Sequence, residues 1–248
     1  MNDESFVVLS ILTILIAVVA FLYSSVGHAG ASGFIAVMSL MGMTPEAIRP
    51  SALSLNILVA TITFIQFYRA GHFSWKLFWP FAVLAIPMAF IGGFLKLPSE
   101  LLKPIVGCVL LFSAYRFFVR ASDDPEAVSC PAEVALATGG ALGLLAGLTG
   151  TGGGIFLTPL LLWNRWSRVK KAAAVSALFI LCNSVSGLAG HIISTKTLPT
   201  TAIPLLVAAA VGGSTGAYLG SKKLPTTTIK RLLAAVLVIA GLKLTMNW

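Results

Sequence analysis

An apolar region of the chain is interrupted by the run Gly147-Leu-Thr-Gly-Thr-Gly-Gly-Gly154. A similar run in the first half, Gly27-His-Ala-Gly-Ala-Ser-Gly33, matches it at an offset of 120 residues. Each run precedes an apolar segment, at 32–43 and 154–163, that is too short to cross a bilayer as a straight helix. The sequence therefore predicts two broken or half helices at matched positions of a duplicated chain.

The composition is that of a membrane protein. The chain has 248 residues, of which 57% are hydrophobic and only 10% charged, and its mean hydropathy is +0.95. A soluble domain has about a quarter charged residues. An ordinary soluble protein, a disordered chain and a nucleic-acid-binding module are therefore excluded. The net charge of +9 fits membrane orientation, because cytoplasmic loops collect Lys and Arg.

Eight apolar segments are long enough to cross a bilayer, which takes about 20 residues. They lie at 6–26, 51–68, 77–95, 102–119, 133–148, 172–193, 201–220 and 229–246. The first is too long for a signal-peptide core, and acidic Asp3 and Glu4 precede it where a signal would be positively charged. We therefore expect it to be a retained membrane span.

Other matches extend the internal repeat. Ala70-Gly71-His72 matches Ala189-Gly190-His191, and Leu97-Pro98 matches Leu224-Pro225. The predicted fold is an all-α integral membrane protein with two homologous repeats, at 1–120 and 132–248, joined by a polar linker at 121–131. Each repeat holds four full transmembrane helices and one short broken or half helix.

The distribution of charge favours inverted repeats. If each short segment crosses, both termini lie outside and the 17 Lys and Arg residues divide 12 inside to 5 outside. If each short segment merges with its predecessor, the best division is 11 to 6, so eight and ten crossings both stay open. An odd number of crossings per repeat inverts the second repeat relative to the first, as in many secondary transporters.

The two breaks are the predicted substrate site. A helix that starts after a break presents free N–H groups and the positive end of its dipole, which attract anions. The alternative is close helix packing by small residues. His28 is either a titratable group of the site or a neutral structural histidine. The polar residues of the long helices either contact the substrate or form hydrogen bonds between helices. The candidate site residues are Gly27, His28, Gly30, Ser32, Gly33, Ser54, Asn56, Gly150, Thr151, Gly152, Gly153, Ser176 and Asn183.

Several chemistries are disfavoured. All eight acidic residues fall outside the apolar interiors, which argues against a cation site or a carboxylate proton relay. The second break has no Lys-Ser/Thr ending, so it is not an ATP-binding loop. No HExxH occurs, and Cys108, Cys130 and Cys182 have no ligand spacing. We expect no metal and no cofactor.

The second break with Pro159, followed by Lys170-Lys171-Ala-Ala-Ala and by Ser176 and Asn183, resembles the signature of the sulfite exporter TauE/SafE family. The first half departs from it, since His28-Ala29 and Ser32 stand where small residues or glycine are usual. The resemblance implies an integral inner-membrane permease that moves sulfite, thiosulfate, sulfoacetate or a related organosulfur anion.

The sequence thus predicts a secondary transporter for a small sulfur-containing anion in a bacterial or archaeal cytoplasmic membrane. Export is favoured, because a monoanion gains about 2.3 kcal/mol per 100 mV on leaving a negative interior. The expected partners are the anion and membrane lipid, without nucleic acid, and a homo-oligomer stays open. The alternatives are a membrane scaffold and a membrane-embedded enzyme with Cys108 or Cys182 as nucleophile.

Overall fold

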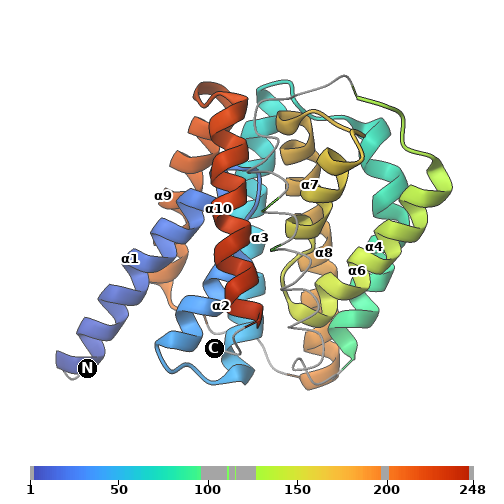
Figure 1. The fold of residues 1–248 in the computed structure, drawn as a ribbon. Coiled ribbons are helices and arrows are strands. Elements are labelled where there is room, and N and C mark those ends of the chain that lie inside the picture. Colours follow the sequence, from blue (N-terminus) through green and yellow to red (C-terminus); the bar gives the residue numbers. More distant parts are fainter. Residues whose placement is uncertain (1–2, 96–110, 112–114, 116–126, 197–200, 246–248) are drawn as a thin grey trace.

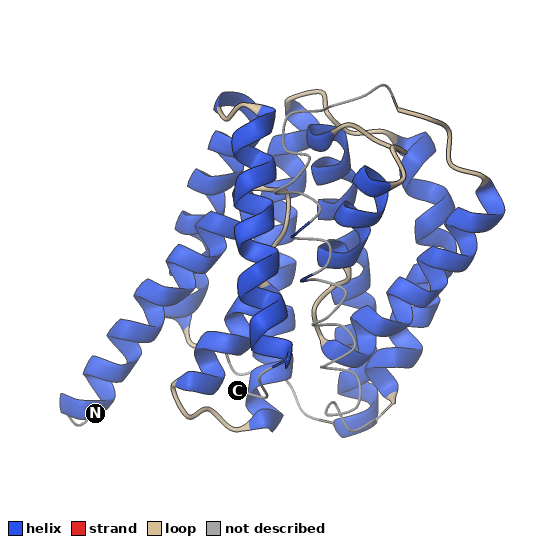
Figure 2. Ribbon diagram, viewed as in Figure 1, coloured by secondary structure: helices blue, strands red, loops and turns tan. Residues whose placement is uncertain are grey.

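The computed structural model describes residues 3–95, 111, 115, 127–196 and 201–245, and no strand occurs among them (Figure 2). The predicted span at 102–119, with Cys108, and residues 121–126 of the predicted linker lie outside the described segments. The helices of the first half are α1 (Asp3–Ser25), α2 (Ala31–Leu40), α3 (Pro45–Arg69) and α4 (Trp75–Phe94). Those of the second half are α6 (Ala132–Thr149), α7 (Gly154–Trp163), α8 (Val169–Thr195), α9 (Ile203–Tyr218), a π-helical turn η1 (Leu219–Lys223) and α10 (Thr226–Thr245).

Six of the described helices are long and apolar enough to span a membrane, which confirms an all-α multi-pass membrane protein. They are Val7–Ser25, Ala47–Arg69, Trp75–Phe94, Ala132–Thr149, Val169–Thr195 and Ile203–Lys223. The short helices α2 and α7 have ten residues each, as expected from the two breaks. The predicted span at 229–246 forms the helix α10, which is not among the six.

The long helices α3 and α8 form the centre of the molecule and pack against each other (Figure 1). Helix α4 lies against α6 and α8, and α9 lies against α1 and α3. In Figure 1, α1 begins and α10 ends at the same, lower end of the molecule, and α1 and α6 run in opposite directions.

Two rows of glycine bring pairs of helices into backbone contact. Gly139, Gly143 and Gly147 of α6 face the backbone of Phe81, Ala85 and Ala89 on α4. Gly212, Gly216 and Gly220 at the end of α9 and in η1 face Ala17, Phe21 and Ser25 of α1. A Cβ atom at any of these six glycines would lie 2.0–2.2 Å from a carbonyl oxygen of the other helix. Small residues at every fourth position permit this close approach in membranes.

The outer faces of the helices are apolar. On α9, Ile203, Val207 and Val211 recur at four-residue spacing and each leaves more than half of its side chain exposed. On α1, Val7, Ile11, Ile14 and Val18 are also exposed. Trp75, Trp79 and Trp163 are exposed near helix ends, where aromatic rings favour the membrane interface. These faces would contact lipid tails.

One of the sequence matches between the two halves does not correspond to equivalent positions in the structure. Ala70-Gly71-His72 follows the end of α3, whereas Ala189-Gly190-His191 lies inside α8. Gly71 has a φ of 77° in a turn, while Gly190 approaches the Phe90 carbonyl of α4 from within its helix. The same three letters serve a turn in one half and helix packing in the other.

Candidate functional site

The first break joins α1 to α2 through two glycines with left-handed backbone conformation. Gly27 has a φ of 85° and Gly30, the N-cap of α2, a φ of 107°. A Cβ atom at Gly27 would lie 2.3 Å from the Cβ of Ala173 on α8. Glycine is therefore required here both for the conformation and for the approach of α8.

The second break joins α6 to α7 in the same manner. Gly150 has a φ of 73°, Gly152 of 74°, and Gly153, the N-cap of α7, of 80°. The glycines that end the first helix and start the short one are Gly27 and Gly30 in one break and Gly150 and Gly153 in the other. The structurally equivalent glycines are therefore 123 residues apart. The alignment of the two glycine-rich runs in the sequence has an offset of 120 residues instead. Consequently, Ser32 and Gly33 lie in the first turn of α2 and not in the break.

The two breaks meet at Asn56, which is fully buried on α3. Its Oδ1 atom accepts a hydrogen bond from the Ala31 N–H, the first backbone donor of α2, over 3.1 Å. Its Nδ2 atom donates to Ser184 Oγ on α8 over 2.8 Å and lies 3.5 Å from the Thr151 carbonyl oxygen of the second break. One side chain thus links the start of α2, the second break and α8.

The second break is tightly packed around this amide. A Cβ atom at Gly152 would lie 2.6 Å from Asn56 Nδ2, 2.7 Å from Ser184 Oγ and 2.8 Å from the Ile180 side chain. The neighbouring Gly154 would meet Ile180 at 2.3 Å. The conformation described is therefore closed around Gly152, with no space for even one more methyl group.

A second polar chain crosses between the halves at His28. His28 Nε2 lies 2.8 Å from Thr158 Oγ1 on α7, and Thr158 donates to Ser176 Oγ on α8 over 2.7 Å. Because the Thr158 hydroxyl donates to Ser176, its oxygen is left to accept from His28, which places the ring proton on Nε2. All three side chains are buried. His28 therefore joins the first break to α7 through a hydroxyl.

The remaining predicted hydroxyls have partners outside this junction. Ser32 lies 2.9 Å from the Tyr23 hydroxyl of α1, and Thr151 lies 2.8 Å from the Thr149 hydroxyl. Ser54 donates to the Pro50 carbonyl one turn earlier in its own helix, over 2.9 Å. A Cβ atom at Gly33 would lie 2.5 Å from Val19, so this glycine serves the packing of α2 on α1.

Asn183 is buried in α8, and neither its amide nitrogen nor its amide oxygen has a hydrogen-bond partner among the residues that the structure describes. It lies seven residues after Ser176 and therefore on the same face of α8. A buried amide without partners typically costs 1–3 kcal/mol. This unpaired group faces the same side of α8 as the His28–Thr158–Ser176 chain.

Sequence reasoning missed four polar residues that complete these contacts: Tyr23, Arg49, Thr158 and Ser184. Thr158 directly precedes Pro159 of the second-half motif, and Ser184 directly follows Asn183. Their positions next to motif residues are the signal in the sequence that could have identified them. No feature of the sequence identified Asn56 and Ser184 as a bonded pair, because 128 residues separate them.

Arg49 lies at the beginning of α3 and reaches the ends of α4 and α6. Its Nη2 atom donates to the Gly147 and Gly92 carbonyls, the latter over 3.2 Å. A Cβ atom added at Gly150 would lie 3.2 Å from the Cγ atom of Arg49. The C-terminal carbonyls of a helix carry partial negative charge, so the guanidinium stabilises both helix ends beside the second break.

Within the described part of the chain, no three His, Cys, Asp or Glu side chains come close enough to hold a metal ion. The side chains at the breaks offer hydroxyls, amides and one imidazole. Such groups, together with helix N-termini, suit hydrogen bonding to a small anion.

Comparison with known proteins shows the family of the chain and relatives named as membrane transporters. The family model described as Sulfite exporter TauE/SafE matches residues 12–244. The chain is 39% identical over 238 residues to the probable membrane transporter protein y4hK of Sinorhizobium fredii (strain NBRC 101917 / NGR234), covering 94% of this chain and 96% of the relative. It is 26% identical over 137 residues to the probable membrane transporter protein MJ0441 of Methanocaldococcus jannaschii, covering 53% and 50%. No solved structure matches the chain.

Proposed function

Because this chain belongs to the sulfite exporter TauE/SafE family, and is thus a membrane permease rather than an enzyme, we propose that it exports a small sulfur-containing anion. The substrate class is sulfite, thiosulfate or an organosulfonate, and the membrane is the cytoplasmic membrane of a bacterium or archaeon. The anion binds between the two glycine breaks. The observation that carries this proposal is the convergence of both breaks on Asn56.

The start of α2 supplies the anion contacts in this proposal. The first N–H groups of a helix lack partners within it and carry the positive end of its dipole. In the structure, the side-chain oxygen Oδ1 of Asn56 accepts a hydrogen bond from the Ala31 N–H. This oxygen therefore occupies the position that an anion oxygen would take. We propose that the substrate displaces Asn56 from α2, while the Asn56 amide nitrogen remains a donor.

The glycines at 27, 30, 150, 152 and 153 allow the backbone to approach the anion. The contacts of Gly27 with Ala173 and of Gly152 with Ser184 close this region. Substrate access in the proposal therefore requires the breaks to separate from α8. Thr151, Ser176 and Asn183 then complete the site with hydroxyl and amide groups, and the unpaired amide of Asn183 gains a partner.

We infer that residues 1–120 and 132–248 are inverted repeats. When α1 is matched with α6, α2 with α7, α3 with α8 and α4 with α9, the pairing of α1 with α9 becomes that of α6 with α4. The pairing of α4 with α8 likewise becomes that of α9 with α3. The two glycine rows follow this exchange, since one joins α6 to α4 and the other α9 to α1. Such symmetry supports alternating access by rocking of one repeat on the other.

The proposed direction, export, is based on the absence of acidic residues from the interiors of the apolar spans. No acidic residue of the sequence falls within an apolar span interior, so no obvious group couples a cation to uptake. A monoanion moving without coupling leaves a negative interior with a gain of about 2.3 kcal/mol per 100 mV.

The test is flux of ³⁵S-labelled sulfite in proteoliposomes that contain only this chain, with a potassium gradient and valinomycin setting the potential. We expect flux toward the positive side, inhibited by excess thiosulfate or sulfoacetate and less by sulfate. Protein-free liposomes are the control. Absence of flux for every sulfur anion tested, in vesicles that hold monodisperse protein, would contradict the proposal and leave a scaffold role.

A further inference from the structure

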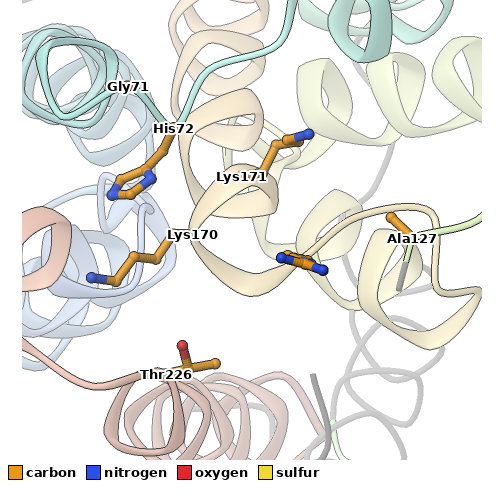
Figure 3. Close-up of a pocket in the computed structure, with 7 residues that line it drawn as sticks. Gly71, His72, Ala127, Lys170, Lys171 and Thr226 are labelled. Atoms are coloured by element: carbon orange, nitrogen blue, oxygen red, sulfur yellow. The ribbon is translucent and has the colours of Figure 1, made fainter. Parts of the chain in front are cut away.

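A cavity of about 530 Å³ opens where the turn after α3, the start of α8 and the start of α10 meet (Figure 3). Four basic side chains line it: His72, Arg168, Lys170 and Lys171. Gly71, Ala127 and Thr226 also line it, and none of the lining residues in the described part of the chain is acidic. The cavity does not include any residue of the two breaks.

Two of the basic groups are held in place by one backbone carbonyl. His72 Nε2 lies 3.0 Å from the Ser221 oxygen in η1, and Lys170 Nζ donates to the same oxygen over 3.4 Å. A carbonyl oxygen only accepts, so His72 carries a proton on Nε2. Figure 3 shows His72 and Lys170 on one side with Thr226 facing them, while Lys171 extends to the other side of the α8 turn.

Arg168 is the N-cap of α8, and its side chain makes no capping hydrogen bond. Arg168 therefore directly precedes the first N–H groups of α8, and a guanidinium and a helix start both favour negative charge. Arg168 and Lys171 are exposed to solvent, while Lys170 and His72 are half-buried. The cavity thus combines exposed and half-buried basic side chains around one helix start.

Membrane orientation alone explains basic residues at this end of the molecule. It does not explain why four of them line one cavity, since Lys222 and Lys223 meet the orientation requirement outside it. These two lysines instead lie 5.3 and 5.6 Å from the centre of the Tyr218 ring. Positive charges around one cavity repel each other, and an anion inside removes this repulsion.

We propose that this cavity binds an oxyanion of the sulfate and phosphate type. The oxygens accept hydrogen bonds from Arg168, Lys170 and Lys171 and from the first N–H groups of α8. The oxyanion comes either from solution, as a free sulfur or phosphorus oxyanion, or from the headgroup of an anionic lipid whose phosphate reaches the cavity. The proposal does not depend on transport by the breaks, because no residue is shared.

The experiment is acetylation of lysine amines by a water-soluble reagent, with mass spectrometry reporting the rate at each lysine. In one arm the full-length protein is in phosphatidylcholine nanodiscs with increasing sodium thiosulfate, sulfate or phosphate. In the other arm the nanodiscs contain phosphatidylglycerol and no added oxyanion. Sodium chloride of equal ionic strength corrects both arms for screening. Lys222 and Lys223 are the internal control on the same end of the molecule.

We expect saturable protection of Lys170 and Lys171 that Lys222 and Lys223 do not share. Arg168→Gln should raise the half-saturating concentration at least about tenfold, while the matched variant Lys223→Gln leaves it unchanged. Protection by thiosulfate, sulfate or phosphate in phosphatidylcholine identifies a solution oxyanion, and protection only in phosphatidylglycerol identifies the lipid. Equal protection of all four lysines in both arms, or no change in Arg168→Gln, would overturn the proposal. Neither result bears on sulfite flux through the breaks.

Discussion

Asn56 Nδ2 on α3 donates a hydrogen bond to Ser184 Oγ on α8 over 2.8 Å, and both side chains are fully buried. The pair lies where the first break, through Ala31, and the second break, through Thr151, come together. A buried polar contact of this kind fixes two central helices relative to each other, since its separation leaves both groups without partners. In the proposed mechanism, Asn56 therefore couples helix packing to anion binding.

The first prediction concerns the charge at position 56. Asn56→Asp retains an acceptor for the Ala31 N–H but places a negative charge at the start of α2. We expect sulfite affinity in detergent, normalised to monodisperse protein, to fall at least about tenfold, because the carboxylate repels the anion. Ser54→Ala, two residues away and with its hydroxyl bonded within its own helix, is the control. Unchanged affinity in Asn56→Asp would place the anion elsewhere.

The second prediction concerns the space at Gly152. Gly152→Ala introduces a methyl group within 2.6–2.8 Å of Asn56, Ser184 and Ile180, so we expect weaker sulfite binding per monodisperse protein and slower flux. Gly42→Ala is the matched control, since Gly42 has a φ of 73° but open space around it. It reports the backbone strain alone, about 1 kcal/mol. If both variants lose folded protein equally and bind normally, the second break is purely structural.

Thr151→Ala offers a milder change in the same break. Removal of this hydroxyl should weaken sulfite binding by one hydrogen bond to a charged group, about 1.5–3 kcal/mol. Its partner Thr149 also bonds to the Leu145 carbonyl, so the fold should remain. Isothermal titration of the purified variant measures this difference directly. An affinity equal to the parent's would remove Thr151 from the site.

The His28–Thr158–Ser176 chain predicts a stability effect. Thr158→Val keeps the shape of the side chain but leaves the His28 ring nitrogen without its partner. We expect a loss of about 1–2 kcal/mol in unfolding free energy, measured by SDS titration. Thr13→Val, whose hydroxyl bonds only to the Leu9 carbonyl of its own helix, should lose less than about 0.5 kcal/mol. Equal losses would mean that His28 has another partner.

The glycine row between α6 and α4 predicts a stability effect, and Gly140 of the same helix offers a control. Gly143→Ala places a methyl group 2.2 Å from the Ala85 carbonyl oxygen, so α6 must move away from α4. The added methyl group of Gly140→Ala meets side chains at ordinary contact distance, Leu84 at 3.4 Å and Met88 at 3.8 Å. We expect Gly143→Ala to lower the melting temperature by several degrees and Gly140→Ala to leave it nearly unchanged or raise it. The reverse order would mean that the two helices pack in another register.

The sequence alone was sufficient for the class of the protein, because hydrocarbon permits only long apolar helices and few charges. It also located both breaks, since glycine with positive φ is the residue that ends one helix and starts another. The segments at 6–26, 77–95, 133–148 and 172–193 correspond to α1, α4, α6 and α8 within a few residues. Local composition determines these features, and no distant contact is needed to read them.

Only the tertiary structure decided which polar groups meet. Asn56 and Ser184 are 128 residues apart, and His28 and Thr158 are 130 apart, so no local pattern connects them. The choice of Ser184 rather than Asn183 as the partner facing α3 was equally beyond the sequence, because adjacent helical residues point about 100° apart and the rotation of α8 is set by its packing on α3 and α4. Residue type tells where a helix can break, but the geometry of packing determines what each break contacts.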